Sequence, residues 1–142
     1  MRIIYISALF IYFSCVSPPE YDDGLIENIP AIVNDDDYFS LSVNGNNYND
    51  SLSWELNLDL SDLDEILTTF IVKDLNVSPS DSSYVISSIV TGDTIFKANI
   101  QSEVIFSSID SVKFIGEIKK VIFKAENFEG KLEYQLIKNP NL

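Results

Sequence analysis

The side chains that could carry out acid–base chemistry in this chain are almost all carboxylates. Its 142 residues include 22 acidic residues, 9 lysines and arginines, one cysteine and no histidine. Without histidine there is no Ser-His-Asp or Cys-His pair and no side chain that ordinarily titrates near neutral pH. Zinc sites ordinarily use histidine or cysteine ligands, and a single cysteine forms no internal disulfide. The composition therefore excludes the commonest hydrolase and zinc chemistries.

The carboxylates form two clusters in the sequence, residues 35–37 and the group Asp59, Asp62, Asp64 and Glu65. Glycoside hydrolysis needs two carboxyl groups that face each other across a cleft, with the pKa of one of them raised by burial. Adjacent exposed acids do not supply that arrangement. The second cluster also lacks the glycine turn and spacing of an EF-hand. We predict a solvated acidic surface, with no catalytic residue, metal or cofactor, and a weak surface site for calcium is the alternative left open.

The basic residues and glycines offer no stronger chemistry. Lys119 and Lys120 are the only adjacent basic pair, and nothing near them predicts the desolvated Ser–Lys pair of a nucleophilic enzyme. The five glycines are scattered and form no phosphate-binding loop. A net charge of −13 repels a phosphate backbone. We therefore predict that the protein is not an enzyme and does not bind nucleic acid.

The first fifteen residues are typical of an address signal. Arg2, the only arginine, precedes an apolar run over residues 3–13, which matches a signal-peptide core and is too short to span a bilayer. Ser14 and Cys15 follow directly. A small residue and a cysteine at the end of such a run resemble a bacterial lipobox. The resemblance implies removal of residues 1–14, lipidation of Cys15 with fatty acid such as palmitate, and a cell-envelope location facing the periplasm or the surface.

Residues 15–37 have the composition of a tether. They contain three prolines and several acids, and no lysine or arginine occurs anywhere between positions 15 and 72. Such a segment cannot bury enough apolar surface to order itself, so we expect it to be solvated. A few aliphatic side chains, including Ile32 and Val33, could still dock on the domain that follows.

Residues 38–142 read as an antiparallel all-β domain. Apolar residues alternate over 38–43 and 54–60, and Asn44-Gly45 predicts a tight hairpin turn with Tyr48 pointing inward. The only tryptophan, Trp54, lies on an apolar strand face, which favours a role as a core anchor. Helical spacing predicts one short helix near 62–68, followed by a strand over 69–77.

The second half of the domain repeats the same signals. Strands over 84–91 and 94–101 flank the turn signal Gly92-Asp93, and another strand covers 103–108. Two further strands, 119–124 and 131–137, are predicted to form a hairpin through 126–130. An extended segment over 112–118 should bend at Gly116. The total is eight or nine short strands, which is typical of a β-sandwich or a small barrel.

The opening of this domain, Tyr38-Phe39-Ser40-Leu41-Ser42-Val43-Asn44-Gly45-Asn46-Asn47-Tyr48, has an aromatic strand, Val-Asn-Gly and a further aromatic residue. Together with the lipobox, it resembles the small, uncharacterised lipoproteins of Bacteroidota. That resemblance implies an envelope location and a β-fold, and it implies no activity.

Three functions remain open. The leading hypothesis is a non-enzymatic, lipid-anchored envelope protein with a binding or structural role and an envelope protein as its partner. A small barrel that binds an apolar ligand is the first alternative. The second alternative is an inhibitor or immunity-type protein whose acidic half binds a basic enzyme.

Overall fold

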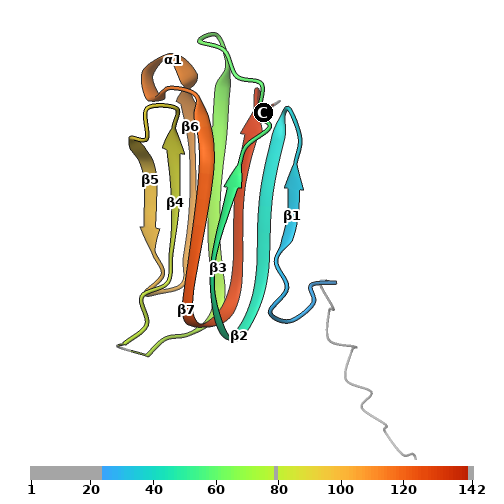
Figure 1. Cartoon of the computed structure of the whole chain (residues 1–142), viewed down its shortest axis with the longest axis vertical. Coiled ribbons are helices and arrows are strands. Elements are labelled where there is room, and N and C mark those ends of the chain that lie inside the picture. The colour runs from blue at the N-terminus through green and yellow to red at the C-terminus, as the bar shows by residue number, and fades with distance from the viewer. Residues whose placement is uncertain (1–23, 79, 141–142) are drawn as a thin grey trace, which may run out of the picture.

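A computed structural model describes residues 24–78 and 80–140, and it shows two layers of antiparallel strands packed face to face (Figure 1). The elements are β1 (Ala31–Asn34), β2 (Tyr38–Glu55), β3 (Glu65–Asn76), β4 (Tyr84–Ile89), β5 (Thr94–Asn99), β6 (Val104–Ser111), α1 (Val112–Ile115) and β7 (Ile118–Lys138). The predicted all-β antiparallel sandwich is confirmed. The sheet does not close into a barrel, because β1 and β6 end its longest row of strands.

The sandwich is organised by two long strands that pair with each other and bend together. The first half of β2, residues 38–45, pairs with residues 130–137 of β7, and the second half, 48–55, pairs with 120–128. The ribbon that they form folds over and supplies two strands to each layer. One layer has the order β1-β2-β7-β3-β6, and in the other β7 also pairs with β4, which pairs with β5.

The hairpins predicted at Asn44-Gly45 and at 126–130 are wrong, because each half of β2 pairs with β7 and not with the other half. Gly45 lies opposite Gly130, and a Cβ atom on Gly45 would stand only 2.8 Å from the backbone oxygen of Phe128. Asn47 and Asn127 take positive φ values of 50° at the bend. The chain does turn at these residues, but the turn bends the paired strands β2 and β7 and does not close a hairpin. The described residues therefore contain seven strands instead of eight or nine.

At two further places the predicted and the observed secondary structure differ: a strand stands where a helix was predicted, and a helix where an extended segment was predicted. The helix predicted near 62–68 is wrong: Asp64 N donates to Ser61 O at 3.0 Å in a turn, and β3 begins at Glu65. The helix instead forms at α1, where an extended segment was expected, and the sharp bend predicted at Gly116 is its end, with φ at 84°. The hairpin around Gly92-Asp93 is confirmed as β4 and β5.

The domain begins earlier than the tether composition predicts. Ala31–Asn34 pair with β2 as an edge strand, and Ile32 packs against the core. Predictions about residues 1–23, including the signal peptide and Cys15, lie outside the described residues. No helix in the described part of the chain is long and apolar enough to cross a membrane.

The core lies between the two layers and is built from alternate residues of the facing strands. Tyr48 is buried, as predicted, and burial together with the Asp50 carboxylate raises the pKa of its phenol to about 12. Trp54 is half-buried and packs against the core from its margin, with its ring centroid 6.3 Å from that of Phe39. Residues 56–60 leave β2 but keep the predicted alternation, so that Leu56, Leu58 and Leu60 are buried outside any strand.

Candidate binding surface

The carboxylates singled out from the sequence do not face one another across a cleft. Asp59, Asp62 and Glu65 are exposed, and only Asp64 is buried. The Asp64 carboxylate accepts hydrogen bonds from the Ser61 backbone and hydroxyl, both at 2.7 Å, and from Asn139 Nδ2 at 2.7 Å. It therefore links the start of β3 to the end of β7.

The surroundings of Asp64 hold it in the charged form. The Ser61 hydroxyl is the largest influence, followed by the Asn139 amide, and with Lys138 Nζ 3.5 Å away they lower the pKa of Asp64 to about 2. A general acid needs the opposite shift, because it must hold a proton near neutral pH. The electrostatics thus favour a structural role for Asp64.

The adjacent lysines, Lys119 and Lys120, both form ion pairs. Lys119 Nζ lies 3.2 Å from Glu117, and Lys120 Nζ lies 3.6 Å from Glu55. A nucleophilic serine needs a desolvated lysine beside it, and both lysines here are partly exposed and paired. Within residues 24–78 and 80–140, no group of three or more acidic, cysteine or histidine side chains could hold a metal ion.

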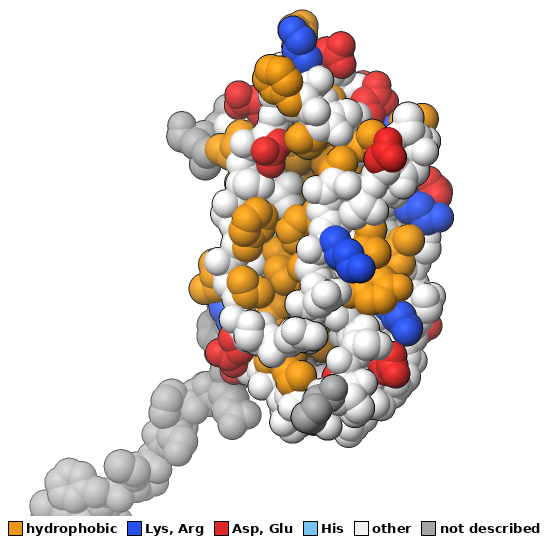
Figure 2. Space-filling model, turned by 90° about the vertical axis from the view of Figure 1, so that its left-hand side faces the viewer, with side chains coloured by type: hydrophobic (Ala, Val, Ile, Leu, Met, Phe, Trp, Pro, Cys, Tyr) orange, Lys and Arg blue, Asp and Glu red, His pale blue; other side chains and the backbone are white. Residues whose placement is uncertain are grey.

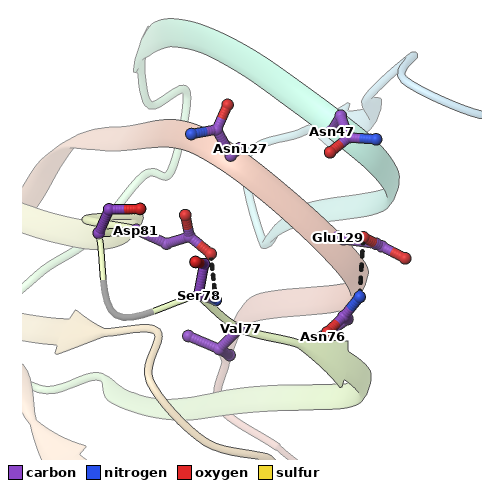
Figure 3. Close-up of a pocket in the computed structure, with 8 residues that line it drawn as sticks. Asn47, Asn76, Val77, Ser78, Asp81, Asn127 and Glu129 are labelled. Carbon is purple, nitrogen blue, oxygen red and sulfur yellow. Dashed lines mark hydrogen bonds between the residues drawn. The ribbon is translucent and has the colours of Figure 1, made fainter.

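A polar hollow of about 460 Å³ lies where the β2–β7 ribbon bends (Figure 3). Its walls carry Asn47, Asn127 and Glu129 from the ribbon, Asn76 from the end of β3, and Asp81 from the segment that follows β3. The Asn76 amide donates to Glu129 at 3.0 Å. Amide side chains also hold the bend itself, since Asn127 N donates to Asn49 Oδ1 at 2.9 Å. These contacts stabilise the bend, and two separate carboxylates do not make a metal centre.

A second hollow is mostly apolar and lies between β5 and β6, where the two layers part; Lys97 and Asp110 also line it. It has two neighbouring sections, of about 480 and 270 Å³, which share Ile95, Phe96 and Phe106. Figure 2 faces this side of the molecule and shows hydrophobic side chains gathered on it. We call this hollow the lateral cleft, and we call the surface made by β5, β6 and the cleft the lateral face.

The floor of the lateral cleft is a cluster of aromatic rings. The centroid of Phe96 lies 5.2 Å from that of Tyr134, 5.6 Å from Phe70 and 5.9 Å from Phe106. Tyr134 is fully buried and donates its hydroxyl to Ser87 Oγ at 3.0 Å, and burial raises the pKa of this phenol. The floor therefore includes the buried core residues Tyr134 and Phe70, whereas Phe106 at the mouth is 40% exposed.

Strand β6 forms one wall of the lateral cleft, and within the part of the chain that the structure describes it pairs with β3 alone. Residues 104–109, Val-Ile-Phe-Ser-Ser-Ile, contain no charge, proline or glycine. Val104, Phe106 and Ser108 line the cleft, whereas Ile105 and Ile109 point to the outer face and are 75% and 43% exposed. An edge strand normally carries charge, proline or a bulge that prevents further pairing. By that measure residues 104–109 of β6 are an unprotected edge, and the charge in this strand is Asp110 near its end.

The lateral cleft could not be found from the sequence, although the residues that form it carried a signal. The apolar run over 103–108 correctly predicts a strand. The way β7 joins the two layers decides which strand becomes an edge. It also decides that β5 and β6 lie on opposite sides of the cleft. The carboxylate clusters, which drew attention in the sequence, are not part of this surface.

Comparison with known proteins adds no relative. The sequence matches no protein-family model, and no curated protein matches it.

Proposed function

We propose that the protein is a non-enzymatic, lipid-anchored protein of the bacterial cell envelope, which binds an extended polypeptide strand along β6. The lipid on Cys15 would hold it at the membrane, and the lateral face would hold the partner. One observation carries the binding proposal: residues 104–109 of the edge strand β6 carry no charge and lie directly beside a mostly apolar cleft.

Strand addition uses both features of the lateral face at once. The backbone of an incoming strand would hydrogen-bond to the free edge of β6, and this contact favours any extended segment. Alternate side chains of that segment would point toward the lateral cleft, because successive residues of a strand face opposite sides. Apolar residues at every second position would therefore be selected.

The non-enzymatic part of the proposal is supported by the contacts that the candidate catalytic residues make. Asp64 is tied to Ser61 and Asn139, and the adjacent lysines are paired with Glu117 and Glu55. The polar hollow is held by amide contacts that serve the bend. Asp64 and the adjacent lysines therefore have structural partners that account for them, and in the polar hollow Asp81 accepts from the Ser78 backbone through Oδ2 while its Oδ1 is buried without a hydrogen-bond partner among the described residues.

The binding proposal can be tested with a fluorescent peptide that has the sequence of residues 103–111, mixed with the full chain. We expect saturable binding by fluorescence anisotropy. Ile105→Lys should weaken it about tenfold or more, because the exposed isoleucine beside the added strand would become a charge. Val33→Lys on the opposite edge, β1, is the matched control and should leave binding unchanged. Binding that does not saturate, or that both variants weaken equally, would contradict the proposal.

A small apolar ligand in the lateral cleft is a second candidate, favoured by the aromatic floor and by the volume of about 480 Å³ in the larger section. An apolar dye such as anilinonaphthalene sulfonate separates the two candidates. Ile105 points away from the cleft, so Ile105→Lys should leave dye binding intact while it weakens strand binding. Dye binding without peptide binding would favour the small-ligand function.

The anchor is tested by the intact mass of the N-terminal fragment, from protein made with its own signal and from a Cys15→Ser variant. We expect the fragment of the natural chain to begin at Cys15 and to carry added acyl mass, and the variant to lack it. A fragment without lipid that begins elsewhere would contradict the anchored location.

A further inference from the structure

We propose that the strand bound along β6 is β6 of a second copy of this chain, paired antiparallel about a two-fold axis through Ser107. The inference rests on the proposed function, in which β6 is the binding edge, and it names the partner. The pairing is two-fold symmetric and uses the free edge of each β6 once, so it closes as a dimer and does not propagate.

The outer face of β6 is complementary to itself in this register. Opposite residues of an antiparallel pair share a face, and pairing about Ser107 places Ile105 opposite Ile109 of the second copy, and the reverse. β-branched residues in such positions stabilise a sheet. Centring the pair on Phe106 or Ser108 would instead set these isoleucines against serines or Glu103. Only the Ser107 register covers both exposed isoleucines with isoleucine.

The inner face fits in the same register. Phe106 would lie opposite Ser108 of the second copy. Ser108 and Asp110 line the smaller section of the lateral cleft, of about 270 Å³, and the serine is a small side chain. The half-exposed ring of each copy would thus cover the cleft of the other. In the dimer, the contact between Phe106 of one copy and Ser108 of the other would bury the phenylalanine ring and fill the smaller section of the lateral cleft.

Charge also favours this meeting point. The chain carries −13 overall, so most of its surface repels a second copy. Residues 94–113, which hold β5, β6 and the first residues of α1, contain two lysines and two acids and are neutral. In the Ser107 register, Glu103 lies opposite Ser111 of the second copy, two residues from Lys113. Asp110 of the second copy lies opposite Val104, one residue from Glu103, so charges of both signs meet at each end of the paired strands.

The test is a cysteine at the axis. Ser107→Cys, in a full chain that also carries Cys15→Ser, places two thiols directly opposite each other. Opposite Cα atoms in antiparallel pairs are about 4.5–5.5 Å apart, which a disulfide accommodates. We expect a disulfide-linked dimer under mild oxidation. Ser51→Cys, which is exposed on the second half of β2, is the matched control and should stay monomeric. Adding Ile105→Lys to Ser107→Cys should reduce cross-linking about tenfold.

The outcomes separate this inference from the proposed function. A chain that binds the 103–111 peptide, yet stays monomeric by sedimentation and does not cross-link at position 107, would overturn the second copy as partner and leave strand binding in place. Failure of both peptide binding and cross-linking would overturn the proposed function as well. A dimer in sedimentation that cross-links equally through Ser51→Cys would overturn the Ser107 register.

Discussion

The strands β1 and β6 end the same row of the sandwich, but the chain treats these two edges differently. β1 has four residues, follows Pro30 and precedes three consecutive aspartates. On that side, Asp59 N donates to Asp36 O at 2.8 Å, so the buried leucines of residues 56–60 are held against the turn between β1 and β2. β6 has eight residues and no charge from Val104 to Ile109, and it borders an open cleft. The contrast is the basis for proposing that one side completes the fold and that the other binds a partner.

The largest expected effect tests this division of the molecule. Leu58 is 2% exposed and Ile105 is 75% exposed, although both are aliphatic residues of the same size. Leu58→Ala should lower the free energy of unfolding by about 2–5 kcal/mol, because it leaves a cavity in packed core. Ile105→Ala should cost less than about 1 kcal/mol in the dilute monomer. Urea unfolding measures the free energy of unfolding of both variants. Equal decreases would show that β6 contributes as much to the stability of the fold as residues 56–60 do.

The next effect compares the two edges directly. A lysine on an edge strand opposes further pairing. Ile109→Lys on β6 should weaken self-association about tenfold or more, whereas Val33→Lys on β1 should have no effect. Both positions are similarly exposed, at 43% and 42%, so the two variants add the same charge at comparable sites. Sedimentation over a range of protein concentrations provides the measurement, and a dimer weakened more by Val33→Lys would place the interface at β1.

The difference between the edges also shows what a sequence can predict. The alternation over 38–43, the hairpin at Gly92-Asp93 and the inward Tyr48 all follow from local periodicity and turn chemistry, and the structure confirms them. Partner choice is not local. The Asn44-Gly45 signal fits a hairpin and a bent ribbon equally well, and the pairing of β2 with β7 decides between them.

Long-range pairing likewise explains why the helix was misplaced and the cleft missed. The acids near 62–68 suit a helix start, but the Asp64 side chain instead binds Ser61 and Asn139, and Asn139 is far away in the sequence. The lateral cleft exists because β7 adds β4 and β5 to one layer and β3 and β6 to the other. No window of the sequence contains that arrangement.

A third effect is confined to acid. The folded chain lowers the pKa of Asp64 to about 2, below the ordinary value near 3.8. A lowered carboxyl pKa contributes stability that is present above the unfolded pKa and is lost as the pH falls through the folded one. The free energy of unfolding should therefore decline between about pH 4 and pH 2. Asp64→Asn should flatten that part of the profile in urea titrations, and an unchanged slope would remove Asp64 from the network that closes this end of the sandwich.

The smallest effect separates the floor of the lateral cleft from its mouth. Tyr134→Phe keeps the ring stacked on Phe96 but removes the hydroxyl that bonds to buried Ser87. A lost hydrogen bond that leaves a buried partner should lower the free energy of unfolding by about 1 kcal/mol. Binding of the 103–111 peptide should not change, because Tyr134 is fully buried and only the rings above it meet the added strand. If peptide binding weakened as much as the free energy of unfolding fell, the floor of the lateral cleft would contribute to binding. The lateral face could then not be separated from the core.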